Sequence, residues 1–131
     1  MKMTLNEVLV NYRNLISLAG KKLPVRLSYA VSKNLRLLEK EAELIEKSRT
    51  ELAEQHAEKD EEGKPATKDG NYVFGENKEK FLEEYNEYLE TEIELDPHRI
   101  PTEEIEKTED SRYDVLSPAE LMGLTFMIEE K

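Results

Sequence analysis

The two histidines are the side chains of this sequence best suited to acid–base or metal chemistry near neutral pH. His98 lies in the run Asp96-Pro97-His98-Arg99, where a carboxylate and an imidazole two residues apart can bind a metal ion or relay a proton. No second histidine lies nearby in sequence, and the chain has no cysteine to complete a ligand set. We therefore interpret His98 as a solvated residue of a turn.

His56 falls on the repeating face of a predicted long helix. As a metal or proton ligand it would need partners from a second helix, and Glu83 and Glu87 are the candidates. The favoured interpretation is a polar residue tolerated in a helical seam, hydrogen-bonded to a tyrosine.

The acidic segment 60–71 carries two glycines and invites comparison with a calcium-binding loop. Such a loop needs acids at alternate positions, and Lys64, Pro65, Ala66 and Thr67 interrupt that pattern. The sequence also has no glycine-rich phosphate loop and no nucleophile motif. We predict no catalytic, cofactor-binding or metal-binding residue, and hence a protein that is not an enzyme.

Carboxylates form the densest chemical group of the sequence, in residues 79–90: Glu79, Glu83, Glu84, Glu87 and Glu90. Steps of 4 and 3 place all but Glu84 on one helical face. A pair of them buried in a cleft could act as acid and base, but a solvated face is the favoured interpretation. An alternative is a row of negative charge that imitates nucleic-acid phosphates and occupies the basic groove of a DNA-binding protein. The neighbouring Lys78 and Lys80 weaken that alternative.

Aromatic side chains at helical spacing, such as Phe81 and Tyr85, are typical of a core. Tyr72 and Phe74 instead lie in a predicted turn region far from any large core, where exposed aromatics can anchor a partner protein. We predict a partner-binding surface made of Tyr72, Phe74, Glu79, Glu83 and Glu87.

Charge is distributed unevenly along the 131 residues, which carry a net charge of -11. Residues 1–40 hold eight basic and two acidic side chains, a charge of +6, and residues 41–131 hold 11 basic and 28 acidic ones, a charge of -17. The basic part is expected to pack beside acidic segments, within one chain or across a dimer. Direct binding of nucleic acid is not expected, because the acidic body repels phosphates.

The chain is expected to be soluble and cytoplasmic, without membrane partners. No apolar run approaches the roughly 18 residues of a membrane span, and the first residues do not form a secretion signal.

Helical periodicity predicts a mainly α fold in one domain, residues 1–131. Thr4 and Glu7 form a capping box that starts a helix over 5–19, and Pro24 starts a long helix over 24–59. In the long helix, a seam of period 3.5 passes through Leu38 and Ile45. The seam is expected to meet a returning helix or a second copy, so a homo-oligomer through it is possible.

The returning helix is predicted over 77–90, which makes a long antiparallel helical hairpin with a small β-turn element at its tip, 60–76. Residues 92–96 alternate like a strand. Ser117, Pro118 and Glu120 start a C-terminal helix over 117–129.

Four segments together resemble an uncharacterised family of small phage and prophage proteins of Gram-positive bacteria: 22–34 (KLPVRLSYAVSKN), 58–64 (EKDEEGK), 69–72 (DGNY) and 116–122 (LSPAELM). The likeness covers most of the chain in order. It implies a viral origin and brings no catalytic residues. With the projecting hairpin and the charge asymmetry, it leads to the hypothesis of a phage protein that binds and modulates, by inhibition, a host or defence protein. The alternatives are a virion or assembly component and the acidic mimic.

Overall fold

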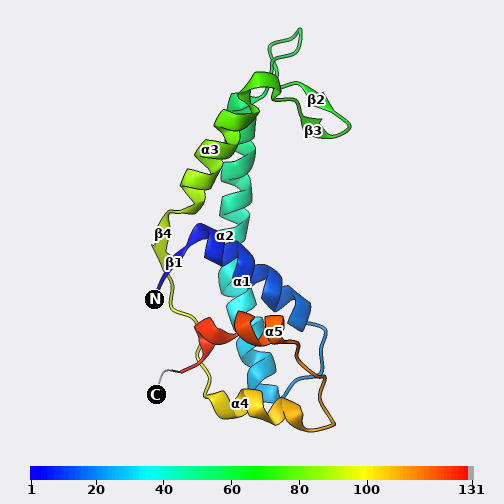
Figure 1. The fold of residues 1–131 in the computed structure, drawn as a ribbon, viewed down its shortest axis with the longest axis vertical. Coiled ribbons are helices and arrows are strands. Elements are labelled where there is room, and N and C mark those ends of the chain that lie inside the picture. Colours follow the sequence, from blue (N-terminus) through cyan, green and yellow to red (C-terminus); the bar gives the residue numbers. More distant parts are fainter. Residues whose placement is uncertain (130–131) are drawn as a thin grey trace. The chain divides into compact units, whose positions relative to one another are not determined.

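A computed structural model describes residues 1–129 and is mainly helical, which confirms the predicted class (Figure 1). The chain divides into two compact units. Unit 1 comprises Met1–Ala42 and the segment from Glu92 onwards, and unit 2 comprises Glu43–Thr91. Helix α2, Val25–His56, contributes its first part to unit 1 and its second part to unit 2.

The other elements of unit 1 are β1 Lys2–Thr4, α1 Leu5–Leu18, β4 Glu92–Glu94, α4 Thr102–Glu106, α5 Pro118–Gly123 and two single 3-10 turns, Lys107–Glu109 and Thr125–Met127. Helix α1 begins at the predicted capping box, in which the Thr4 hydroxyl accepts from the Glu7 N–H. Its buried face includes Val8, Leu15 and Leu18. The seam residue Leu38 of α2 is fully buried in the same unit.

The predicted strand at 92–96 is present as β4, and its partner is the N-terminal strand β1. The two run antiparallel, with Lys2 opposite Glu94 and Thr4 opposite Glu92. The sequence did not indicate β1, because a strand of three residues is too short to show alternation.

The C-terminal helix is shorter than the predicted 117–129. It begins as expected, with the Ser117–Glu120 capping box and Pro118 in the first turn, but α5 ends at Gly123. After the 3-10 turn the chain extends, and Ile128 forms a parallel bridge with Ile100. The Ile100 N–H donates to the Met127 carbonyl, and the Glu129 N–H donates to the Ile100 carbonyl. These hydrogen bonds replace helical ones in the last described residues.

A close approach of α5 to α1 at Gly123 leads to the first prediction. A Cβ at this position would lie 2.8 Å from the Asn14 Cβ, an atom fixed to the backbone of α1. We expect Gly123→Ala to lower the free energy of unfolding by about 1–2 kcal/mol, because overpacking outweighs the helix propensity gained at a terminal position. Urea unfolding measures it. The control, Gly20→Ala, has nothing within 4 Å and should stay within about 0.5 kcal/mol of the parent; equal losses in both would contradict the account.

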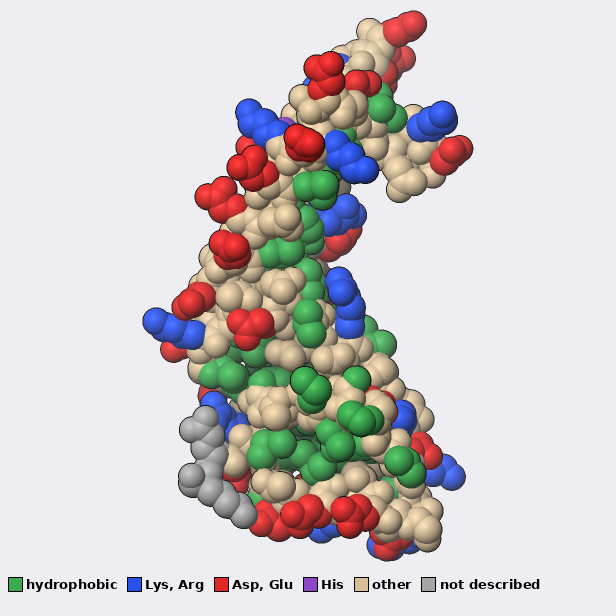
Figure 2. Space-filling model, in the orientation of Figure 1, with side chains coloured by type: hydrophobic (Ala, Val, Ile, Leu, Met, Phe, Trp, Pro, Cys, Tyr) green, Lys and Arg blue, Asp and Glu red, His purple; other side chains and the backbone are tan. Residues whose placement is uncertain are grey.

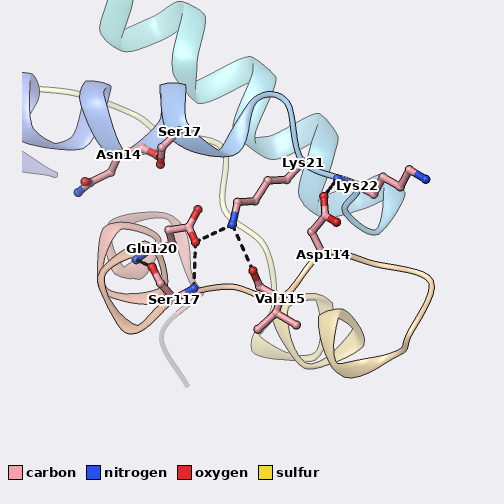
Figure 3. Close-up of polar contacts among 8 residues, drawn as sticks. All are labelled: Asn14, Ser17, Lys21, Lys22, Asp114, Val115, Ser117 and Glu120. Atoms are coloured by element: carbon pink, nitrogen blue, oxygen red, sulfur yellow. Dashed lines mark hydrogen bonds and ion pairs between the residues drawn. The ribbon is translucent and has the colours of Figure 1, made fainter.

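The linker between α1 and α2 is joined to the segment before α5 (Figure 3). The Lys21 ammonium lies 2.8 Å from the Glu120 carboxylate and donates to the Val115 carbonyl at 3.2 Å. The Lys22 N–H donates to Asp114 at 2.7 Å. Of the eight basic residues in 1–40, only Lys21 and Arg26 make ion pairs with the described residues. Within residues 1–129, the expected pairing of the basic segment with acidic segments is therefore limited to these two sites.

Glu120 gives a pH-dependent prediction. The Lys21 ammonium and the Ser117 N–H hold the pKa of the Glu120 carboxyl below its ordinary value of 4.5. Because the folded-state pKa is lower than the unfolded-state pKa, the charged carboxylate stabilises the fold at pH values above the unfolded-state pKa. This stabilisation is lost as the pH falls through the folded-state pKa. We expect Glu120→Gln to cost about 1 kcal/mol at pH 7 and clearly less at pH 3, measured by urea unfolding. The exposed Glu106→Gln serves as control and should show no such change; a deficit for Glu120→Gln that is constant with pH would contradict the assignment.

Unit 2 contains the second part of α2, the strands β2 Thr67–Lys68 and β3 Asn71–Tyr72, a 3-10 turn Gly75–Asn77 and α3 Lys78–Leu89. The strands form the small β element expected within 60–76, with Thr67 opposite Tyr72. Asp69 and Gly70 connect them with φ of 54° and 82°. Positive φ at both central residues defines a type I′ turn, for which Asp-Gly is a preferred sequence.

An aromatic cluster holds unit 2 together. Phe81 is buried, and its ring stacks on Phe74 with centroids 4.6 Å apart and on Tyr85 at 6.0 Å. The His56 ring lies 6.4 Å from the same ring. The seam residue Ile45 is also buried, within this unit. Since Leu38 and Ile45 are both covered by their own chain, neither needs a second copy for its burial.

Candidate functional site

The candidate site is the acidic face of α3, defined by Glu79, Glu83 and Glu87. All three side chains are exposed, and none makes an ion pair or side-chain hydrogen bond with the described residues. Acidic side chains gather along the outer edge of α3 in the space-filling view (Figure 2). The predicted solvated face at 79–90 is thus present as a row of carboxylates that no cation of the described chain neutralises.

Glu84 differs from the other glutamates of this helix. Its carboxylate lies 2.9 Å from Nε2 of His56, within unit 2. The sequence suggested Glu83 or Glu87 as acidic partners of His56, or a tyrosine, and the structure has Glu84 in that place. The reason is helical geometry: Glu84 is three residues after Phe81, so it shares the inward face with that ring.

The acidic face does not stabilise helix α3. Glutamates four residues apart repel each other, at a cost of about 0.2–0.5 kcal/mol per pair. Glu79 lies in the first turn, where the helix dipole favours an anion, but Glu87 lies in the last turn of α3, which has no basic residue. The carboxylates therefore contribute little to folding.

Tyr72 and Phe74 are half-buried and contribute to the packing of unit 2. The Tyr72 hydroxyl donates to the Glu54 carboxylate at 3.0 Å, and this hydrogen bond raises the pKa of Tyr72. The Phe74 ring lies on Phe81. Both also line a hollow of about 450 Å³ beside the β2–β3 turn, together with Lys68 and Lys78. Sequence reasoning expected exposed anchors and missed that Phe81 lies within reach.

His98 lies in unit 1, and its ring meets the Tyr29 ring edge-on with centroids 5.2 Å apart. No hydrogen bond or ion pair joins the His98 ring to Asp96. Within residues 1–129, no three histidine, aspartate or glutamate side chains are arranged to hold a metal ion.

The backbone of His98 is fixed by a residue that the sequence did not single out. Asn34, only 1% exposed, donates from Nδ2 to the His98 carbonyl at 2.8 Å and accepts from the His98 N–H at 2.7 Å. The signal was present in the sequence: Asn34 follows Val31 by three residues and precedes Leu38 by four, on the apolar face of α2.

Comparisons with known proteins return no match, whether the chain is scanned against protein-family models or searched against curated proteins and solved structures. Within residues 1–129, no helix combines the length and the apolar character that crossing a membrane requires.

Proposed function

We propose that this chain is a non-enzymatic, phage-encoded protein that binds and modulates, by inhibition, a host or defence protein in the bacterial cytoplasm. The observation that carries the proposal is the unneutralised acidic face of α3, Glu79, Glu83 and Glu87. In this function unit 2 serves as a helical hairpin with a β-turn tip that presents the acidic face to a basic surface of the partner.

Contacts within unit 2 support the hairpin. His56, the last residue of α2, contacts Phe81 in the first turn of α3, and its Nε2 atom lies 2.9 Å from the Glu84 carboxylate. The end of α2 and the start of α3 are therefore adjacent, and the two helices run side by side in opposite directions (Figure 1). The inward face of α3 is thus occupied by its own unit, and the acidic face remains available.

The spacing of the acidic face indicates the chemistry of the partner. Residues four apart on a helix are about 6 Å apart along its axis. Three carboxylates in such a row suit a surface of arginine and lysine side chains. Complementary charge of this kind increases the specificity of binding and makes association faster and dependent on salt concentration. Since none of the three is engaged with another residue of 1–129, binding breaks no ion pair within that part of the chain.

An acidic mimic of nucleic acid is the second candidate, and the regular row of carboxylates favours it. The charge density of the row argues against a mimic. One DNA strand carries a charge about every 3.4 Å along the helix axis, against about 6 Å along this row. A mimic would also have to tolerate Lys78 and Lys80 at the start of the same helix. We therefore favour a basic protein surface that is not itself a nucleic-acid groove.

The test is affinity capture from lysate of the bacterial host with the tagged full chain and two variants. The first replaces Glu79, Glu83 and Glu87 by glutamine. The second, a matched control, replaces the exposed Glu58, Glu61 and Glu62 by glutamine. The proposal predicts one dominant captured protein that is lost at 0.5 M salt and with the first variant, and retained with the second. Equal capture by both variants would refute it, and a DNA-binding identity for the captured protein would support the mimic instead.

A further inference from the structure

A second charged surface, of opposite sign, lies on unit 1. The exposed residues Arg26, Tyr29, Lys33, Arg36 and Lys40 follow one another on α2 in steps of 3 and 4, so they share one helical face. The loop that contains His98 and Arg99 lies beside this face, because Asn34 fixes the His98 backbone through two hydrogen bonds. We call this surface, with its flanking loop, the basic groove.

Two hollows form the basic groove. One, of about 550 Å³, is lined by Val25, Tyr29, Ile100 and Pro101 with Arg26 and Arg99 among its charged residues. The other, of about 240 Å³, is lined by Lys33, Arg36, Leu37 and Lys40. His98 lines both hollows, so each of them borders on this one residue beside α2.

The cations of the groove are largely unneutralised. Lys33, Arg36, Lys40 and Arg99 make no ion pair with the described residues, and the Lys33 ammonium lies over the Tyr29 ring, 5.8 Å from its centroid. Arg26 has one ion-pair partner among residues 1–129, Glu104 at 3.7 Å, and Glu104 is also paired with Lys107 at 2.9 Å. Two carboxylates, of Asp96 and Glu129, line the hollows. The groove is therefore cationic in a chain of net charge -11.

Exposed apolar surface accompanies these cations. Val25 is 83% exposed and Tyr29 is 58% exposed, and they border the larger hollow. This site combines several unpaired cations with the apolar surface of Val25 and Tyr29. Such a site suits a ligand that has carboxylates around an apolar side chain.

We propose that the basic groove binds an acidic peptide segment of a partner protein, with an apolar side chain of that segment in the hollow between Tyr29 and Ile100. Nucleic acid fits less well. A chain of this net charge repels it, and the groove offers one exposed aromatic ring for stacking instead of a series. The groove goes beyond the acidic face of α3: it is a separate surface on the other unit and takes a ligand of opposite charge.

The proposal is tested by selecting a random library of twelve-residue peptides on the immobilised full chain, followed by fluorescence anisotropy with the selected peptide. The expected peptides are rich in aspartate and glutamate around a leucine or phenylalanine. Lys33→Glu with Arg36→Glu should weaken binding by about tenfold or more. Tyr29→Ala should weaken peptide binding severalfold, because it removes apolar contact surface from the larger hollow.

Arg13→Glu with Lys22→Glu is the matched control, because it reverses the same number of charges at exposed positions of unit 1 that line neither hollow. It should bind as the parent does. The variant with Glu79, Glu83 and Glu87 replaced by glutamine should also bind fully, which separates this proposal from that for α3. Circular dichroism confirms that each variant is folded. Selection of neutral or basic peptides, equal weakening by control and groove variants, tighter binding of a labelled thymidine oligonucleotide, or a dimer that occupies the groove would each overturn the proposal.

Discussion

Replacing Phe81 by alanine is expected to lower the free energy of unfolding by about 3–5 kcal/mol, the usual range for a buried phenylalanine. Phe81 is 6% exposed, and rings from three different segments contact it: His56 of α2, Phe74 before α3 and Tyr85 of α3 itself. Truncation removes the common partner of all three. It leaves a cavity that the short β2–β3 turn cannot fill without moving.

Leu82→Ala is the matched control for Phe81→Ala, because Leu82 is the next residue of the same helix and is 43% exposed. We expect it to cost about 1 kcal/mol or less. Urea unfolding followed by circular dichroism gives both values. If the two substitutions cost the same, the aromatic cluster is not what holds unit 2 together.

Replacing Asn34 by leucine is expected to cost about 2–4 kcal/mol. The substitution is close in volume, but it removes both hydrogen bonds to the His98 backbone and leaves that N–H and carbonyl without their partner. An unsatisfied buried polar group costs about 1–3 kcal/mol, so two such groups account for the expected loss. The side-chain contact of Asn34 with the Met127 sulfur is lost as well.

The neighbouring Lys33→Leu is the control for Asn34→Leu, since Lys33 is exposed on the same turn of α2. It should change stability by less than about 0.5 kcal/mol. Hydrogen exchange of the His98 amide adds a local measurement: its protection should be lost with Asn34→Leu and retained with Lys33→Leu. Unchanged protection in both variants would contradict the role assigned to Asn34.

The elements that the sequence predicted well are those with local signals. Capping boxes at Thr4 and Ser117 mark helix starts because their hydrogen bonds reach only three residues along the chain. Asp69-Gly70 predicts a turn because few other pairs adopt positive φ at both positions. The 3.5-residue repeat of α2 identifies Leu38 and Ile45, and both are buried.

The sequence was uninformative where the deciding contact is distant. Strand β1 pairs with residues about 90 positions away, and Asn34 bonds to a residue 64 positions away. The end of α5 depends on the bridge between Ile128 and Ile100. No local pattern encodes such partners, because they exist only after the chain has folded.

The same distinction applies to the candidate site. The acidic face of α3 follows from helical spacing alone, so its exposure could be predicted. The packing of Tyr72 and Phe74 could not, because it depends on where the β2–β3 turn lies against Phe81.

The acidic face of α3 is proposed to contact a partner protein. Site-specific photo-crosslinking tests it most directly, with a photoreactive amino acid in place of Glu83 in the full chain and, as control, in place of the exposed Glu61. In lysate of the bacterial host, we predict one crosslinked protein at position 83, suppressed by 0.5 M salt, and none at position 61. No crosslink at position 83, or the same crosslinks at both positions, would contradict the claim.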